Sequence, residues 1–439
     1  MKTLAVRIHG ANDLRLESFE LPPVGDDEIL ARVVSDSLCM SSHKLAVLGD
    51  RHKRVRANLT AAPAIIGHEC CGIIEETGFV WKDRFKKGDR FAIQPAVIVD
   101  NGDGTSSHWA LGYSYSYAGG DATWILLPGE LIKNGCLLKS GADNFYSASL
   151  AEPVSCVIGA FHAQYHTSEG SYQHRMGPRE GGSMALLAGV GPMGLGAIDY
   201  ALHGPRRPAR LIVTDINEAR LERARRLLPP EKAAEEGIEL CYVNTGNLGD
   251  PAQRLKDLNR GKPFDDVFVF APLRELIELG DKLLGRDGCL NFFAGPTDTA
   301  LEAALNFYQV HYDSHHIVGT SGGNVADMEE GLTLMAQGKI NPVFMITHVG
   351  GLDAVPSATL NLPRIPGGKK LIYTHKKLEL SAIDDFAEKG KKEPFFARLA
   401  ELCDKTQGLW NREAEDYLLT HAPDIGAPDI PDTNEGSIS

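Results

Sequence analysis

Several features are missing from this sequence, and each absence excludes a class of protein. Acidic side chains outnumber basic ones by 58 to 45, which gives a formal net charge of -13. A surface with this mean charge repels a polyanion, so nucleic acid is excluded as an expected partner. No apolar run approaches the length that spans a bilayer, and charged residues interrupt the N-terminal segment before a secretory stretch can form. We therefore expect no membrane partner and a cytoplasmic location.

The cysteines are few and scattered. The eight of them stand at positions 39, 70, 71, 136, 156, 241, 289 and 403. They show neither the regular spacing of a disulfide framework nor the four-cysteine cluster of a closed structural zinc site. Free thiols in a reducing compartment are the expectation.

The 439 residues are too many for one typical core and suggest two or three domains. The first part is rich in short β-branched stretches, such as 28–34 and 65–75, which glycine and proline turns break. Helix-period apolar positions recur between residues 383 and 419. From residue 184 the pattern changes to strand, glycine turn and helix, which predicts a doubly wound parallel sheet. Strands are expected at 184–188, 211–214, 239–243, 266–270, 289–293 and 316–319, a helix at 325–335 and a further strand at 343–347.

These patterns predict an α/β protein with a β-rich domain and a dinucleotide-binding domain. The expected domains are residues 1–180, the first part of the β-rich domain, and 181–338, the nucleotide-binding domain. Residues 339–439 are expected to return to the first domain, followed by a helical extension and a flexible tail rich in Pro, Asp, Gly and Ser.

A glycine fingerprint, Gly189-x-Gly191-x-x-Gly194, follows an expected strand and opens an expected helix. The first glycine permits the tight turn, the second lets the backbone approach a pyrophosphate, and the third lets the helix pack on the strand. Asp215 ends the next strand, where a carboxylate can bind the adenosine ribose and repel a 2'-phosphate, which favours NAD(H) over NADP(H). The alternative is a plain strand-to-helix turn of another α/β protein. The candidate cofactor-binding residues are Gly189, Gly191, Pro192, Met193, Gly194, Asp215 and Arg220, the last of which would soften the preference.

A second set of residues predicts a metal site. Cys39 and His68 are ligand types that zinc takes, and Glu69 or Glu152 can supply an oxygen while one position stays open. Taken singly, each has a structural alternative: a buried thiol, a hydrogen-bonded core histidine or a charge at a helix N-terminus.

The order of the motifs decides between these alternatives. Cys39-x-Ser41, Gly67-His68-Glu69, Gly88-Asp89-Arg90 and Glu152-Pro153 all precede the glycine fingerprint, and together they resemble the zinc-dependent medium-chain dehydrogenase family, in particular its polyol branch. The resemblance extends to about residue 375. It implies a GroES-like catalytic domain, a Rossmann domain, an active-site cleft between them, one catalytic zinc ion per subunit and a homodimer or homotetramer.

The sequence also departs from that family. Met40 and Ser42 replace the glycine and aspartate that commonly flank Ser41, and His43 stands one place before the usual relay histidine. The structural-zinc lobe lacks its cysteines, and residues 101–107 occupy that neighbourhood. The expected catalytic residues are Ser41 and His43 as a proton relay and Glu69, beside a zinc ion that acts as a Lewis acid during hydride transfer.

A short basic run stands between the two metal-ligand segments. Arg51, Lys53, Arg54 and Arg56 put four cations into six residues, and arginine matches the oxygens of a phosphate group. The alternative is a solvated loop, and the polar segment between residues 162 and 175 is a second candidate wall of the substrate site.

The leading function is therefore NAD-linked, zinc-dependent reduction of a ketose phosphate or the reverse oxidation of a polyol phosphate. The alternatives are an unphosphorylated polyol or hydroxy amino acid as substrate, and a non-catalytic redox sensor.

Overall fold

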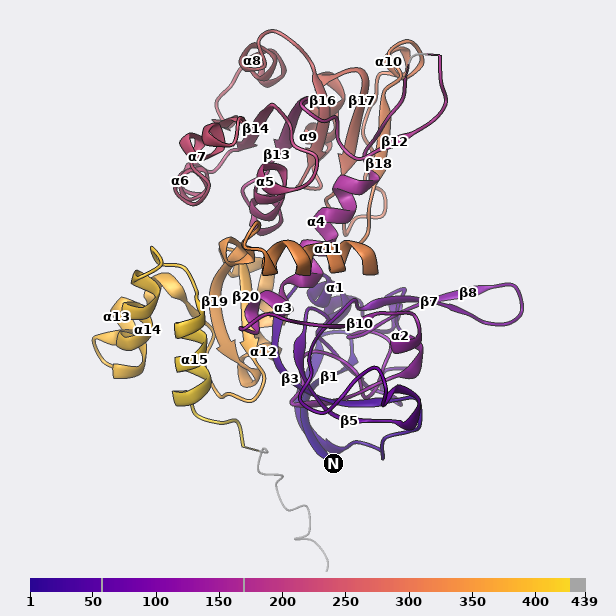
Figure 1. Cartoon of the computed structure of the whole chain (residues 1–439), viewed down its shortest axis with the longest axis vertical. Helices are drawn as coiled ribbons and strands as arrows, with labels where there is room; N and C mark the ends of the chain where they lie inside the picture. The colour runs from indigo at the N-terminus through magenta and orange to yellow at the C-terminus, as the bar shows by residue number, and fades with distance from the viewer. Residues whose placement is uncertain (57, 169, 427–439) are drawn as a thin grey trace, which may run out of the picture. The chain divides into compact units, whose positions relative to one another are not determined.

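The computed structural model describes residues 1–56, 58–168 and 170–426, and the expected flexible tail lies outside them. The chain divides into two compact units, which are described separately (Figure 1). The first contains Met1–Ser149, His348–Pro366 and the residues from Lys370 onward, and the second contains Leu150–Thr347 and Gly367–Lys369. The domain boundaries expected from the sequence, after residues 180 and 338, stay a prediction, because they refer to domains that fold separately.

The first unit is rich in β-structure, as expected. Its strands are β1 (Lys2–Gly10), β2 (Asp13–Glu20), β3 (Ile29–Leu38), β4 (Ala64–Ile65), β5 (Cys71–Thr77), β6 (Arg90–Ile93), β7 (Ala96–Asp100), β8 (Ser106–Ala110), β9 (Trp124–Leu127), β10 (Leu137–Lys139), β19 (Ile346–Gly351), β20 (Lys369–Tyr373) and β21 (Ser381–Ala382). The main sheet has the order β10-β6-β5-β3-β20-β19-β21, with β9 paired to β3. Strands β19 and β20, which follow the nucleotide-binding part in the chain, therefore complete this sheet.

The helices of the first unit lie at three places in the chain. They are α1 (Met40–Leu48), α2 (Gly129–Lys133), α3 (Tyr146–Ser149), α12 (Val355–Asn361), α13 (Phe386–Gly390), α14 (Pro394–Asp404) and α15 (Arg412–His421). The last three lie in the C-terminal extension. Its anchor is Glu415, which is almost fully buried and accepts the hydroxyl hydrogen of Tyr373 at 2.9 Å, while Trp410 donates to the same hydroxyl at 2.8 Å.

The second unit contains the predicted doubly wound sheet. The parallel strands run in the order β15-β14-β13-β16-β17-β18. Their bounds are β13 (Ser183–Leu187), β14 (Arg210–Asp215), β15 (Glu239–Asn244), β16 (Phe264–Val269), β17 (Leu284–Phe292) and β18 (His316–Gly319), beside a small pair β11 (Tyr165–His166) and β12 (Arg175–Met176). The helices are α4 (Ala151–Ala163), α5 (Pro192–His203), α6 (Glu218–Leu227), α7 (Pro230–Glu235), α8 (Pro251–Leu258), α9 (Arg274–Leu283), α10 (Phe307–Tyr312) and α11 (Val325–Ala336).

Alternation along the strands separates two cores. Met184 and Leu186 of β13 belong to the core that contains residues of α4 and α5, whereas Ala185 and Leu187 belong to the core with α8 and α9. Successive side chains of a strand point to opposite faces, so a continuous apolar run indicates a sheet covered on both sides. Within the described part of the chain, every helix is too short or too polar to cross a membrane.

Two expectations about strands need correction. Residues 343–347 were expected to be extended, but Pro342–Met345 form a 3-10 helix and β19 begins only at Ile346. Pro342 has no N–H for a strand ladder, and the Asn341 side chain accepts the N–H of Val343, which favours a helical turn. The stretch from Ile65 to Glu75 is likewise not one strand, because a turn at Gly67 separates β4 from β5.

Candidate functional site

The predicted metal ligands Cys39, His68 and Glu69 meet in the first unit. One ligand atom from each, a sulfur, a ring nitrogen and a carboxylate oxygen, lies within 4.8 Å of the other two. Cys39 stands between the end of β3 and the first turn of α1, so a buried strand and a helix N-terminus fix its position. His68 and Glu69 are both buried. Among the described residues this is the one group of at least three such side chains that could hold a metal ion.

A glycine turn presents the histidine and the glutamate. Gly67 has a φ of +89°, and a Cβ atom there would lie 2.2 Å from the Asp36 carboxylate and 2.5 Å from the backbone nitrogen of Asp121. Only glycine fits this close approach at a positive φ. The turn sets His68 and Glu69 between β4 and β5, so their positions depend on the β-sheet rather than on a mobile loop.

Three serines hold the metal-binding group. Ser41 Oγ lies 2.9 Å from Cys39 Sγ and 3.4 Å from Nε2 of His68, and Ser42 Oγ lies 3.3 Å from Nδ1 of the same ring. Ser37 donates to the Glu69 carboxylate. The sequence identified Ser41 but missed Ser37 and Ser42. The hydrogen bond between Ser42 and Nδ1 orients the imidazole ring and leaves Nε2 on the side of Cys39.

Two buried carboxyl groups lie behind this site, and sequence analysis missed both. Asp36 accepts the N–H of Glu69 at 2.9 Å. Burial, together with the nearby charges of Asp121 and Glu69, raises the pKa of Asp36 well above its usual value, and burial raises the pKa of Asp121 to about 7. Asp121 is remote in sequence from Asp36 and no motif marks it, so only the fold shows that they are neighbours. The raised pKa values favour the neutral forms of both carboxyl groups, and a cation bound nearby would favour their ionised forms.

The other expected site residues of this region have separate surroundings. Nδ1 of His43 is 2.9 Å from the carbonyl oxygen of Thr359 in α12, so this ring contacts the neighbouring helix, and its part in a proton relay stays a prediction. Glu152 belongs to the second unit, where it lies in the first turn of α4 and accepts a weak hydrogen bond from Cys156 at 3.5 Å. Its role as a metal ligand also stays a prediction.

The basic run reaches the metal-binding group through one aromatic ring. The ring of the buried Tyr113 lies 5.1 Å from the His68 ring, measured between ring centroids. The His52 ring stacks on the same tyrosine at 5.1 Å, and the Arg54 guanidinium lies 5.3 Å from its centroid. Arg56 instead lies 3.4 Å above the ring of Trp109. Tyr113 was missed because nothing in its own sequence neighbourhood marks it.

Further cations gather here. Burial lowers the pKa of Lys44. Cys39 raises this pKa and Lys53 lowers it, so both groups lie near the Lys44 ammonium. Burial and the neighbouring cations lower the pKa of His52 to about 4, so this ring is neutral at physiological pH. Arg51 and Lys53 are exposed. The side of the site toward the basic run is thus positive, whereas the two carboxyl groups lie behind the metal ligands.

The glycine fingerprint of the second unit has the geometry of a nucleotide-binding turn. It joins β13 to α5, with Gly191 as the N-cap and Pro192 as the first helical residue. A Cβ atom on Gly194 would lie 2.1 Å from the carbonyl oxygen of Gly189, whereas one on Gly191 would meet no atom within 4 Å. The backbone at Gly191 is therefore open to a ligand at the N-terminus of α5, beside Met193, as the fingerprint predicted.

The residues expected to contact the ribose stand at the end of β14. Asp215 accepts the N–H groups of Ile216 and Asn217 with one oxygen, both at 2.9 Å. Arg220 is exposed in the first turn of α6. One carboxylate oxygen of Asp215 thus fixes the turn, and contact of this side chain with a ribose hydroxyl stays a prediction.

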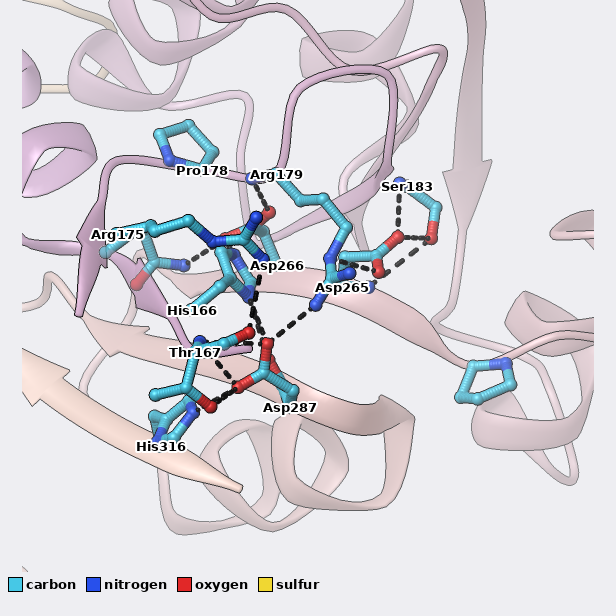
Figure 2. Close-up of polar contacts among 12 residues, drawn as sticks. His166, Thr167, Arg175, Pro178, Arg179, Ser183, Asp265, Asp266, Asp287 and His316 are labelled. Carbon is cyan, nitrogen blue, oxygen red and sulfur yellow. Dashed lines mark hydrogen bonds and ion pairs between the residues drawn. The ribbon is translucent and has the colours of Figure 1, made fainter. Parts of the chain in front are cut away.

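The polar segment between residues 162 and 175 is engaged within the second unit. His166 lies between Asp266 and Asp287, with its ring nitrogens 3.1 Å from Asp266 and 2.8 Å from the carbonyl oxygen of Asp287 (Figure 2). His162 pairs with Asp327 at 2.7 Å, and His174 stacks on Tyr165. These contacts attach the segment to the nucleotide-binding sheet.

Comparisons with known proteins agree with this arrangement. Residues 25–134 match the family model of the alcohol dehydrogenase GroES-like domain, and residues 192–337 match that of the zinc-binding dehydrogenases. The structure of 2R,3R-butanediol dehydrogenase from Bacillus subtilis superimposes with a TM-score of 0.67 at 19% identity, covering 84% of this chain and 99% of that one. The expected combination of a GroES-like and a Rossmann domain is confirmed.

Two curated relatives are similar over almost their whole length. Mannitol-1-phosphate 5-dehydrogenase of Aliivibrio fischeri is 52% identical, and the alignment covers 95% of this chain and 97% of that protein. L-sorbose 1-phosphate reductase of Klebsiella pneumoniae is 46% identical, with 96% of this chain and 98% of that protein covered.

Proposed function

The chain belongs to the zinc-dependent medium-chain dehydrogenase family, in its polyol branch, and from this premise we propose that it interconverts a ketose phosphate and a polyol phosphate, with L-sorbose 1-phosphate reduction as the leading reaction. The observation that supports a phosphorylated substrate is the position of Arg54, whose guanidinium shares the Tyr113 ring with His68. A guanidinium close to the candidate metal ligands can hold a phosphate while another part of the same sugar meets the reacting groups.

The residues present fit a zinc ion. Cys39, His68 and Glu69 offer the sulfur, nitrogen and oxygen donors that zinc accepts, and zinc–ligand bonds of about 2.0 to 2.3 Å can be reached from their spacing by small side-chain movements. When bound, zinc supplies Lewis-acid polarisation of a carbonyl or hydroxyl oxygen, and the nicotinamide cofactor supplies or accepts the hydride.

The chain's own residues orient the substrate and move the proton. Ser41 Oγ, within 3.4 Å of both Cys39 Sγ and His68 Nε2, is placed to exchange a proton with a substrate oxygen that reaches this group. Ser42 keeps the His68 ring in its orientation. Lys44 and Arg54 add positive charge that favours an anionic substrate.

The decisive experiment compares phosphorylated and unphosphorylated substrates. We expect reduction of L-sorbose 1-phosphate to exceed that of L-sorbose, and the variant Arg54→Gln to raise KM for the phosphate about tenfold or more through loss of a charge-assisted hydrogen bond. The matched control is Arg84→Gln, an arginine of the same unit that lies over the ring of Phe85. Equal activity on both substrates, unchanged in Arg54→Gln, would instead favour an unphosphorylated polyol or hydroxy amino acid.

A second candidate reaction is oxidation of mannitol 1-phosphate. The 52% identity to mannitol-1-phosphate 5-dehydrogenase supports it. Both reactions need a phosphate site, so Arg54→Gln affects both, and the ratio of turnover on the two substrates decides between them.

We also propose NAD(H) as the preferred cofactor. Support comes from the Asp215 carboxylate at the end of β14, which would repel the 2'-phosphate of NADP(H), although Arg220 in the next helix lowers that repulsion. The eight cysteines are free thiols, which supports the cytoplasm as the compartment.

Finally, we propose a homodimer or homotetramer. The sheet of the second unit ends at β18, where Ile317 is 44% exposed, and the preceding helix α10 exposes the aromatic side chains of Phe307, Tyr308 and Tyr312. An open strand edge beside an apolar surface favours association with a second copy. Ile317→Lys is expected to reduce the mass measured by light scattering, and an unchanged mass would place the interface elsewhere.

A further inference from the structure

A cavity in the first unit lies outside the site described above. It has a volume of about 330 Å³, at the small end of the range for ligand sites. The C-terminal extension supplies one wall, from Leu380 to Lys389, and the opposite wall comes from α12 and from His348 of β19. The family resemblance ends near residue 375, so this cavity exists only because the extension packs against the sheet.

The polar lining suits a neutral ligand with many hydroxyl groups. Polar atoms come from Ser357 and Asn361, which donate to the carbonyl oxygens of Ala354 and Ser357 and present their side-chain oxygens as acceptors, between apolar patches from Ile365 and Leu380. Hydroxyl and amide groups beside small apolar surfaces match a sugar or polyol, which carries hydroxyls along its edge and C–H groups on its faces.

The charges of the lining disfavour a phosphate. The one ammonium, that of Lys389, already donates to the Glu379 carboxylate and to Ser381, and Asp385 adds a negative charge. Burial and the nearby Lys370 lower the pKa of His348 to about 4, so its ring is neutral and offers one donor and one acceptor. The basic run differs in charge, because it carries four cationic side chains within six residues.

Helix α12 connects the cavity to the helix that carries the reacting serines. Ser357 and Asn361 are four residues apart and face the cavity, whereas Thr359 stands about 200° around the helix from Ser357. The carbonyl oxygen of Thr359 contacts Nδ1 of His43 in α1, which also carries Ser41 and Ser42. A displacement of α12 by a ligand therefore reaches α1 through this hydrogen bond.

We propose that this cavity is a second ligand site, that it takes a neutral hexitol or ketohexose, and that its occupation changes activity at the Cys39–His68–Glu69 site through α12 and α1. The binding step does not depend on the substrate of the enzyme. The regulatory step rests on the proposed function, because it is measured with the phosphorylated substrate.

Calorimetric titration of the full-length chain with D-mannitol, D-sorbitol and L-sorbose tests binding. The titration uses the Cys39→Ala variant, so that heat from the catalytic site is removed. We expect saturable millimolar binding of at least one of the three, and weakening by about tenfold or more in Asn361→Ala and in Ser357→Trp, which fills the cavity from an exposed position. Asp385→Ala is compared with Asp384→Ala, its exposed neighbour that does not line the cavity and should leave affinity unchanged.

The regulatory step is tested in the wild-type enzyme. Saturating polyol is expected to change kcat or KM for the sugar phosphate by about threefold or more, within the usual range of coupling between two sites, and both Asn361→Ala and Ser357→Trp should abolish this response to added polyol. Absence of saturable binding, or equal binding in wild type and both cavity variants, overturns the site. Binding without any kinetic effect overturns its regulatory role, and loss of all activity on sugar phosphates counts only against the proposed function.

Discussion

Ser42 is the side chain on which the orientation of His68 depends. Its hydroxyl meets Nδ1 of the imidazole at 3.3 Å, where an aspartate is usual in the family. We predict that Ser42→Ala weakens zinc binding about tenfold to a hundredfold, the usual cost of losing the partner of a metal-bound histidine. Competition with a chromogenic chelator measures the affinity. Ser42→Asp should restore tight zinc binding, and the exposed Ser106→Ala is the neutral control. Unchanged zinc affinity in Ser42→Ala would show that the sheet alone fixes the His68 ring.

Asp215 is predicted to set the cofactor preference through its charge. Asp215→Asn keeps an oxygen for the N–H groups of Ile216 and Asn217 but removes the negative charge. The ratio of kcat/KM for NADH to that for NADPH should fall by about tenfold, because repulsion of the 2'-phosphate is lost. Asp250→Asn, which removes the charge from the aspartate that caps helix α8 of the same unit, should leave the ratio unchanged. A constant ratio in Asp215→Asn would refute the assignment.

The sequence predicted those residues whose position follows from the local chain. The glycines of the fingerprint and Asp215 lie within one strand-turn-helix-strand segment, so their spacing alone implies their geometry. Asp121 and Tyr113 were missed because they reach the site from elsewhere in the chain, without a periodic pattern or a motif. Ser42 was recognised only as a departure from the family, because a hydroxyl can bond with many partners.

Among the structural elements, the β11–β12 segment is attached to the sheet by a buried polar cluster (Figure 2). His166 is held by Asp266, and Asp287 accepts hydrogen bonds from Thr167 at 2.7 Å, Arg179 at 2.8 Å and His316 at 2.9 Å. The cluster joins two short strands to the starts of β16 and β17. Its integrity, rather than apolar packing, keeps the segment in place.

We predict that His166→Gln lowers the free energy of unfolding by about 2 kcal/mol near neutral pH, through loss of a buried charge-assisted bond. Burial alone would lower the pKa of His166, but Asp266 more than offsets this, so the pKa is raised. A raised pKa means that the stabilisation is fully present below the unfolded value of about 6.5 and is lost as pH rises through the folded value.

Urea unfolding of wild type and His166→Gln between mildly acidic and alkaline pH measures this effect. The difference in stability between the two proteins should shrink as pH rises, because only the wild type loses a bound proton at this position. His421→Gln, at the exposed end of α15, is the matched control and should behave as wild type. A difference that stays constant with pH would mean that His166 is neutral in the folded protein.

For the molecule as a whole, the strand order could be predicted far better than the attachment of the extension. Each strand of the second unit is an apolar run followed by a helix, and such alternation has few foldable arrangements. The extension was predicted as helical from its periodicity, but the residues that attach it to the body were not. That contact depends on one buried carboxylate, Glu415, which accepts the N–H groups of Phe145 and Tyr146, and no sequence pattern links residues so far apart.

The division into two units leads to a last prediction, because metal ligands and glycine fingerprint belong to different units. Removing zinc with a chelator should reduce turnover by about a thousandfold or more, since several kcal/mol of charge stabilisation are lost. NADH should still bind with an affinity within about threefold of the metal-loaded protein, because the backbone at Gly191 and the N-terminus of α5 form without the metal-binding group. NADH fluorescence titration beside elemental analysis measures both quantities. Added zinc should restore turnover in wild type but not in Cys39→Ala. Turnover that survives complete metal loss would remove zinc from the mechanism. A collapse of NADH binding would show that the metal organises both units.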